Sequence, residues 1–157
     1  MKKIILLLLL SNVIFATEIQ ERPDIRPLQN NDIVKIVRGF GNGHYGIDFA
    51  CFGDTKINAT GNGEIILARW LPGYGNTIII KHQWVKDGIP ITVYSLYGHL
   101  SEFLYLKGTQ VSKGQVIALS GTSGRSDGYH LHYELRNANN KSIWNGTYQA
   151  EKNAEKK

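Results

Sequence analysis

Four of the five histidines in this sequence lie in segments whose residue types and spacing suggest chemistry. The first segment, residues 44–48, reads HYGID. Alternate side chains of an extended chain share one face, so His44 and Asp48 would point the same way. Gly46 between them would leave room for a metal ion to approach. The pair could supply two zinc ligands, although a histidine and an aspartate at this spacing also occur by chance.

A second group of polar side chains lies in the segment 130–135, HLHYEL. If this segment is a strand, His130, His132 and Glu134 share one face, and the apolar residues of the segment share the other. A satisfied core histidine would explain one such residue. It explains two histidines beside a glutamate poorly, so the pattern favours a metal or catalytic site.

The remaining histidines each end a run of strand-forming residues. His99 follows Gly98 and, taken alone, would be interpreted as an exposed turn residue. His82 follows the apolar run 78–80 and Lys81, and has no partner nearby in the sequence. We therefore interpret His82 as structural.

Together these residues form a set suited to metal-assisted hydrolysis of an amide. A catalytic zinc has three protein ligands and one open position for water. His44, Asp48 and either His130 or His132 would complete the ligands, and the remaining histidine and His99 would transfer protons. The helical HExxH motif and the GxSxG motif are both absent from the sequence, which argues against those two hydrolase classes.

The elements that must position these residues are short strands. Runs of four to nine residues rich in isoleucine, valine, tyrosine or threonine are separated by glycine-containing turns. This pattern predicts an all-β fold, an antiparallel sandwich or open barrel with an active-site groove. Residues 101–106 could form at most a short helical turn. The predicted strands are 33–37, 47–52, 64–70, 76–82, 89–97, 115–119 and 131–135.

The chain of 157 residues suits one folded domain. Residues 1–16 have the basic start, the apolar run and the small Ala16 of a cleaved signal peptide. We expect a linker over 17–31, the metallopeptidase domain over 32–147 and a charged tail over 148–157. Export to the periplasm or the extracellular space follows, with no stable membrane insertion after cleavage. The single cysteine, Cys51, excludes an internal disulfide and fits a small core residue.

The composition excludes some classes of protein. Hydrophobic residues make up 42% and charged residues 20%, as in ordinary globular proteins. The net charge of +5 is modest, and the basic residues do not form a patch interleaved with aromatic residues. We therefore expect no nucleic-acid partner, and we expect a monomer.

Seven motifs, in order, resemble those of the LytM/lysostaphin-type zinc endopeptidases, the glycyl-glycine endopeptidase family. They extend over about residues 38–136, most of the chain that follows the predicted signal peptide. The motifs are GFG at 39–41, HxGID at 44–48, GYGN at 73–76, YGHL at 97–100, VxKGQ at 111–115, GxSG at 121–124 and HLHYE at 130–134.

The resemblance implies hydrolysis of peptide cross-links in bacterial peptidoglycan by attack of a zinc-bound water. His44, Asp48 and His132 would be the metal ligands, and His99 and His130 the catalytic pair. It also implies an antiparallel sheet with a groove over it. The sequence departs from the pattern in the short spacing before His44, in the segment 51–54 and at Tyr129, which could narrow the groove.

Three other interpretations explain the sequence less completely. A non-catalytic LytM-like regulator that binds and activates cell-wall amidases would have a similar fold, but such relatives usually lack some zinc ligands, whereas this sequence has the full set. A carrier-like β module would explain the segment 111–117 but not the HLH motif. A nucleic-acid binder would require a basic patch.

Overall fold

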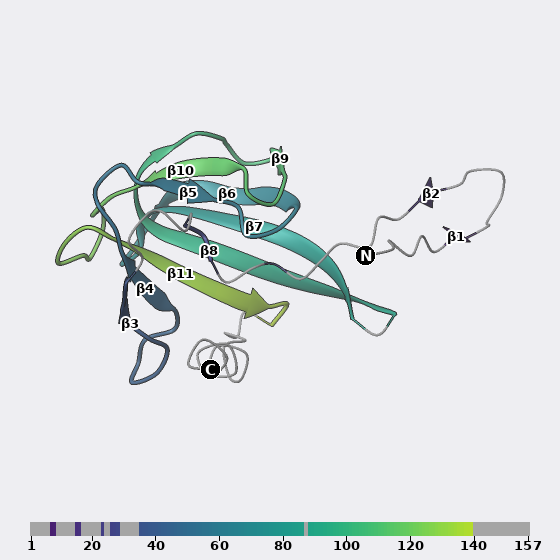
Figure 1. The fold of residues 1–157 in the computed structure, drawn as a ribbon, viewed down its shortest axis with the longest axis horizontal. Coiled ribbons are helices and arrows are strands. Elements are labelled where there is room, and N and C mark those ends of the chain that lie inside the picture. The colour runs from purple at the N-terminus through teal and green to yellow at the C-terminus, as the bar shows by residue number, and fades with distance from the viewer. Residues whose placement is uncertain are drawn as a thin grey trace.

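The computed structural model describes residues 7–8, 15–16, 23, 26–28, 35–86 and 88–139. Within these residues every regular element is a β-strand (Figure 1), which confirms the predicted fold class. No helix among them is long and apolar enough to cross a membrane. Most of the predicted signal peptide, most of the linker and all of the charged tail lie outside the described residues.

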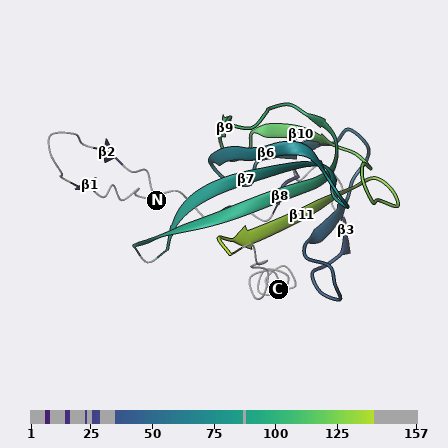
Figure 2. The same ribbon diagram turned by 180° about the vertical axis from the view of Figure 1, so that it is seen from behind.

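Nine strands form one antiparallel sheet in the order β3-β4-β11-β8-β7-β6-β9, with β10 paired to both β5 and β8. Figure 2 shows the same sheet from behind. Two further strands, β1 (Leu7–Leu8) and β2 (Phe15–Ala16), pair only with each other. The strands of the large sheet are β3 (Lys35–Arg38), β4 (Ile47–Ala50), β5 (Lys56–Asn58), β6 (Gly63–Leu71), β7 (Gly75–Lys86), β8 (Ile89–Phe103), β9 (Gln110–Val111), β10 (Val116–Ser120) and β11 (His130–Asn137).

Strand β8 lies at the centre of this arrangement and changes partner along its length. Residues 93–98 pair with β11, whereas Leu100, Glu102 and Phe103 pair with β10. The segment 101–106, which the sequence limits to at most a short helical turn, begins as a strand, because residues 101–103 extend β8 toward β10. The change of partner occurs at His99, whose φ of 61° is unusual for a residue other than glycine.

The hydrophobic core lies on one face of β11 and its neighbours. Leu131, Tyr133 and Leu135 are fully buried there, as the alternation in the sequence predicts. The Tyr97 ring of β8 packs against the Tyr133 ring with centroids 5.3 Å apart. Leu28, from the predicted linker, also packs in this core and is only 5% exposed.

The opposite face of β4, β11 and β8 carries polar residues. Asp48 of β4 and Gly98 of β8 lie directly opposite His132 of β11, one on each side. Tyr133, one residue further along β11, pairs with Ile47 and Tyr97 on the core face. Strand register alone therefore separates the apolar core from a polar face over the middle of the sheet.

Candidate metal centre

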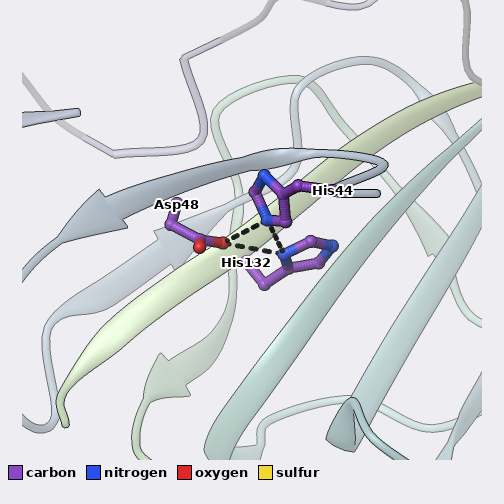
Figure 3. Close-up of side chains that lie close together, drawn as sticks. All are labelled: His44, Asp48 and His132. Carbon is purple, nitrogen blue, oxygen red and sulfur yellow. Dashed lines mark hydrogen bonds and ion pairs between the residues drawn. The ribbon is translucent and has the colours of Figure 1, made fainter. Parts of the chain in front are cut away.

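Three side chains from two segments far apart in the sequence converge over strand β11 (Figure 3). His44 precedes β4, in a tight turn closed by backbone hydrogen bonds in both directions with Gly41. Asp48 lies within β4, and His132 lies opposite it on β11. All three side chains are buried, at 6–8% exposed.

The three potential ligand atoms are close to one another. His132 Nδ1 lies 2.7 Å from Asp48 Oδ1 and 3.1 Å from His44 Nε2, and His44 Nε2 lies 3.1 Å from the same carboxylate oxygen. Ligands about 2.0–2.1 Å from a tetrahedral zinc are roughly 3.3 Å apart. The observed separations are close to that value, so this set can hold a metal ion.

The protons of the two imidazoles are held on their outer nitrogens. His44 Nδ1 lies 2.8 Å from the carbonyl oxygen of Gly39, which can only accept, so this nitrogen donates. His132 Nε2 lies 2.9 Å from a carboxylate oxygen of Glu134 and donates to it. The inner nitrogens of neutral histidines therefore present lone pairs beside the Asp48 carboxylate. Such a cluster of acceptors requires a cation, and two imidazoles with one carboxylate fit zinc.

The two carboxylate neighbours of His132 favour its protonated form. Burial lowers the pKa of His132, but its hydrogen bonds to Asp48 and Glu134 outweigh burial and raise the pKa above its usual value. Burial of Asp48 opposes its ionisation, yet the hydrogen bond and charge of His132 lower the pKa of that carboxyl group. Zinc and a proton would therefore compete for His132 Nδ1, as is common for metal ligands in proteins.

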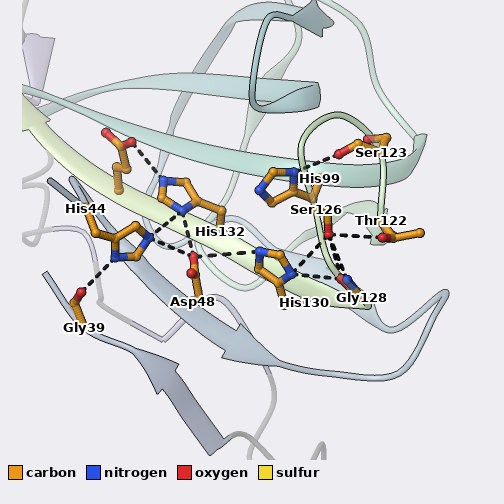
Figure 4. Close-up of polar contacts among 11 residues, drawn as sticks. Gly39, His44, Asp48, His99, Thr122, Ser123, Ser126, Gly128, His130 and His132 are labelled. Carbon is orange, nitrogen blue, oxygen red and sulfur yellow. Dashed lines mark hydrogen bonds and ion pairs between the residues drawn. The ribbon is translucent and has the colours of Figure 1, made fainter.

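His99 and His130 lie beside the three-residue cluster, with ring centroids 4.6 Å apart (Figure 4). His99 Nδ1 donates to the carbonyl oxygen of Ser123 at 2.8 Å, and His130 Nδ1 donates to that of Gly128 at 2.9 Å. Both carbonyls belong to the loop between β10 and β11. The loop therefore fixes the tautomer of both rings, which leaves each Nε2 available to accept a proton.

The surroundings of His99 favour its neutral form. Burial is the main cause that lowers the pKa of His99, and the neighbouring His130 and His132 lower it further. A neutral imidazole at neutral pH can act as a general base. His130 Nε2 lies 3.9 Å from Asp48 Oδ1, farther from the carboxylate than either His44 or His132. The geometry therefore favours His132 over His130 as the third ligand.

Gly46 is required for a reason that differs from the one expected from the sequence. We predicted that it leaves room for a metal ion. A Cβ atom at this position would instead lie 2.5 Å from the carbonyl oxygen of Tyr133 and 2.8 Å from side-chain atoms of His132 and Glu134. The absence of a side chain thus lets the segment before β4 pack directly against β11.

A groove of about 490 Å³ passes over these residues. Tyr129, which we expect to narrow the groove, is exposed, lines it and packs over Gly53. Arg38 and Arg125 also line the groove, so positive side chains border it. An extended chain that crosses the groove would pass over the histidine cluster.

Sequence reasoning found all five clustered residues but not the groups that orient them. The rings of His99 and His130 are oriented by the backbone carbonyl groups of Ser123 and Gly128. Backbone groups are common to all residues, so the sequence gives no pattern that would identify them. Tyr74 and Arg136 contact Glu134; Tyr74 lies within the GYGN motif, and Arg136 lies two residues after the HLHYE motif. His82 lies on the core face, hydrogen-bonded to Ser95 and to the backbone of Asn62, in agreement with its structural interpretation.

Comparisons with known proteins agree with this geometry. The pattern of Peptidase family M23 matches residues 42–145. Over 92 residues the chain is 42% identical to the peptidoglycan DD-endopeptidase ShyA of Vibrio cholerae, a match that covers 59% of this chain. The matched region spans only 20% of the length of ShyA.

Two solved structures resemble this fold. A zinc-containing peptidase from Vibrio cholerae superposes with a TM-score of 0.68 at 31% identity, covering 79% of this chain and 39% of that one. The catalytic domain of the antimicrobial peptidase lysostaphin from Staphylococcus simulans superposes with a TM-score of 0.59 at 34% identity. That match covers 66% of this chain and 80% of the lysostaphin domain.

Proposed function

Because this chain belongs to Peptidase family M23, we propose that it is a zinc endopeptidase that cuts peptide cross-links of bacterial peptidoglycan. Family membership and the similarity to lysostaphin confirm the resemblance noted in the sequence. The observation that carries the proposal is the convergence of His44 Nε2, Asp48 Oδ1 and His132 Nδ1 beside His99, whose pKa is lowered by burial. The printed activity of ShyA supports peptidoglycan as the substrate.

In this proposal different residues of the groove bind the metal, accept a proton and donate a proton. Zinc held by His44, Asp48 and His132 would supply an activated water with a pKa of about 7 and polarise the scissile carbonyl. His99 accepts a proton from the attacking water through Nε2. His130, adjacent to it, would once protonated stabilise the oxyanion or donate a proton to the leaving amine through Nε2.

The alternative function is a non-catalytic regulator of cell-wall amidases. Such a protein needs the fold and the groove, but it does not need three ligands with convergent lone pairs. It also does not need two further histidines whose tautomers are fixed by one loop. The completeness of the set therefore supports the enzyme.

The proposed substrate lies outside the cytoplasm, so the proposal includes export of this chain. The basic and apolar residues at the N-terminus support a signal peptide. The periplasm and the extracellular space are both compatible with a peptidoglycan substrate.

Digestion of purified peptidoglycan tests the proposal. We expect the zinc-loaded protein to release cut cross-link peptides, identified by mass, and a chelator to stop the release. The His132→Ala variant lacks one of three ligands and is expected to lose both stoichiometric zinc and activity. The His82→Gln variant changes a histidine on the core face and should keep both. Absence of release from several wall types by zinc-loaded protein would contradict the enzyme and favour the regulator.

A further inference from the structure

Glu134 is the most deeply buried carboxylate among the described residues. It lies on the polar face of β11, two residues after His132, and its exposed fraction is 0%. An ionised side chain in such a place is strongly destabilising unless hydrogen bonds and an opposite charge compensate for the lost water. The metal ligands and the catalytic pair do not include it.

Three partners compensate the buried charge of Glu134. Its Oε1 accepts a hydrogen bond from His132 Nε2 at 2.9 Å and another from the Tyr74 hydroxyl at 2.9 Å. Its Oε2 pairs with Nε of Arg136, and the Arg136 guanidinium also donates to the Tyr74 hydroxyl at 3.0 Å. Tyr74 and Arg136 therefore hold the carboxylate in place, and its third contact is Nε2 of His132.

This contact determines which nitrogen of His132 faces the cluster. A carboxylate can only accept, so the proton of a neutral His132 stays on Nε2 and the lone pair stays on Nδ1. The Tyr74 ring lies 5.4 Å from the His132 ring and restricts its tilt. Carboxylates in this position on metal-bound histidines orient the ring and increase its basicity.

We propose that Glu134, fixed by Tyr74 and Arg136, is a positioning residue that keeps His132 Nδ1 aimed at the zinc ion. The inference rests on the proposed function in one respect, namely that the cluster binds zinc. Glu134 itself touches neither the metal nor the substrate. Its effect should therefore appear in the affinity for zinc, independently of peptidoglycan hydrolysis.

Glu134→Gln tests the proposal because it keeps the shape and removes the charge. If the new amide turns its oxygen toward His132, its NH₂ group faces the Arg136 guanidinium, donor against donor. If it turns the other way, His132 Nε2 loses its acceptor. We expect zinc affinity, measured by competition with a chromophoric chelator, to fall about 10- to 100-fold. The absorption spectrum of the Co²⁺-loaded protein should also change.

Glu102→Gln is the matched control, since it removes the same charge from an exposed position at the far end of β8. It should leave zinc affinity unchanged. The melting temperature of each metal-free variant separates a folding defect from a defect in the site. A folded Glu134→Gln protein with wild-type zinc affinity would overturn the proposal.

Tyr74→Phe provides a second test, which also serves if Glu134→Gln does not fold. It removes one hydrogen bond from Glu134 and leaves both charges in place. We expect zinc to bind about two- to tenfold more weakly, and unchanged affinity would again argue against positioning. If the wild-type protein binds no zinc, the proposed function fails as well. If the wild type binds zinc and both variants match it, only the positioning role fails.

Discussion

His99 presents its ring to the groove from a backbone conformation that residues with a Cβ rarely adopt. Its φ is 61°, and its backbone N–H donates to the carbonyl oxygen of Tyr74 at 2.7 Å. Such a conformation destabilises an ordinary residue by about 1–2 kcal/mol. The strain coincides with the point where β8 changes from one partner strand to another. The same irregularity therefore turns the strand and aims the histidine at the cluster.

Replacement of His99 by asparagine tests its proposed role as a base. Asparagine tolerates positive φ better than alanine does, so the strand should keep its course. We expect zinc content to stay at the wild-type value and the rate of cross-link cleavage to fall roughly 100- to 10,000-fold, because general base catalysis is lost. The measurement is turnover on peptidoglycan together with metal analysis. Unchanged turnover would mean that His99 is structural.

At the residue scale, the sequence predicted which side chains gather but not how each ring is oriented. Spacing within 44–48 and 130–134 placed His44, Asp48, His130 and His132 on shared faces. The choice between His130 and His132 depends on register, because His132 lies opposite Asp48 while His130 lies opposite Ala50. Register is a relation between distant segments, and no local pattern encodes it.

At the scale of elements, packing of the segment before β4 against β11 depends on Gly46. Alanine there would place a Cβ against the backbone of Tyr133, which cannot move without breaking the pairing of the two strands. We expect Gly46→Ala to reduce the free energy of unfolding of the metal-free protein by about 1–3 kcal/mol, measured by urea denaturation. Zinc affinity should fall as well, because the displaced segment carries His44.

Gly39→Ala is the matched control for that prediction. No atom lies within 4 Å of the position where a Cβ would be built on Gly39. Its free energy of unfolding should stay within about 0.5 kcal/mol of the wild type. Equal free energies of unfolding for the Gly46→Ala and Gly39→Ala variants would show that close packing at Gly46 does not stabilise the contact between the strands.

The strands themselves were predicted with uneven success. Alternation and β-branched residues identified the seven runs that correspond to β3, β4, β6, β7, β8, β10 and β11, although β7 and β8 are longer than expected. Strands β5 and β9 were missed because they have only three and two residues. Such short elements are defined by the partners they meet in space, namely β10 and β6.

At the scale of the whole molecule, a series of hydrogen bonds between buried polar groups connects β7, β8, Thr60 and β11 behind the site. His82 of β7 bonds to Ser95 of β8 at 2.7 Å, and Ser95 bonds to the Tyr97 hydroxyl at 3.1 Å. The Tyr97 hydroxyl meets Thr60 Oγ1 at 2.9 Å, and Tyr133 of β11 donates to that same oxygen at 2.9 Å. Tyr133 directly follows His132, so this network supports the strand that carries the metal ligand.

Burial favours a neutral His82. Its Nδ1 donates to the carbonyl oxygen of Asn62 at 2.8 Å, and its Nε2 lies 2.7 Å from the hydroxyl oxygen of Ser95. Burial lowers the pKa of His82 from 6.5 to about 4. Between these two values the unfolded chain binds more protons than the folded one, so stability rises with pH over this range. Acidification therefore destabilises the fold through a residue outside the groove.

We expect protonation of His82 to reduce the free energy of unfolding by about 3 kcal/mol when the pH falls from 7 to 4, since each pKa unit corresponds to about 1.4 kcal/mol. The measurement is urea denaturation of the metal-free protein at several pH values, for the wild type and for His82→Gln. The glutamine cannot titrate, and the carboxylates and other histidines are common to both proteins. The difference in free energy of unfolding between the two proteins therefore reports on His82 alone. This difference should change steeply between pH 6.5 and pH 4 and stay constant above pH 7. Parallel curves across that range would mean that protonation of His82 is tolerated in the folded core.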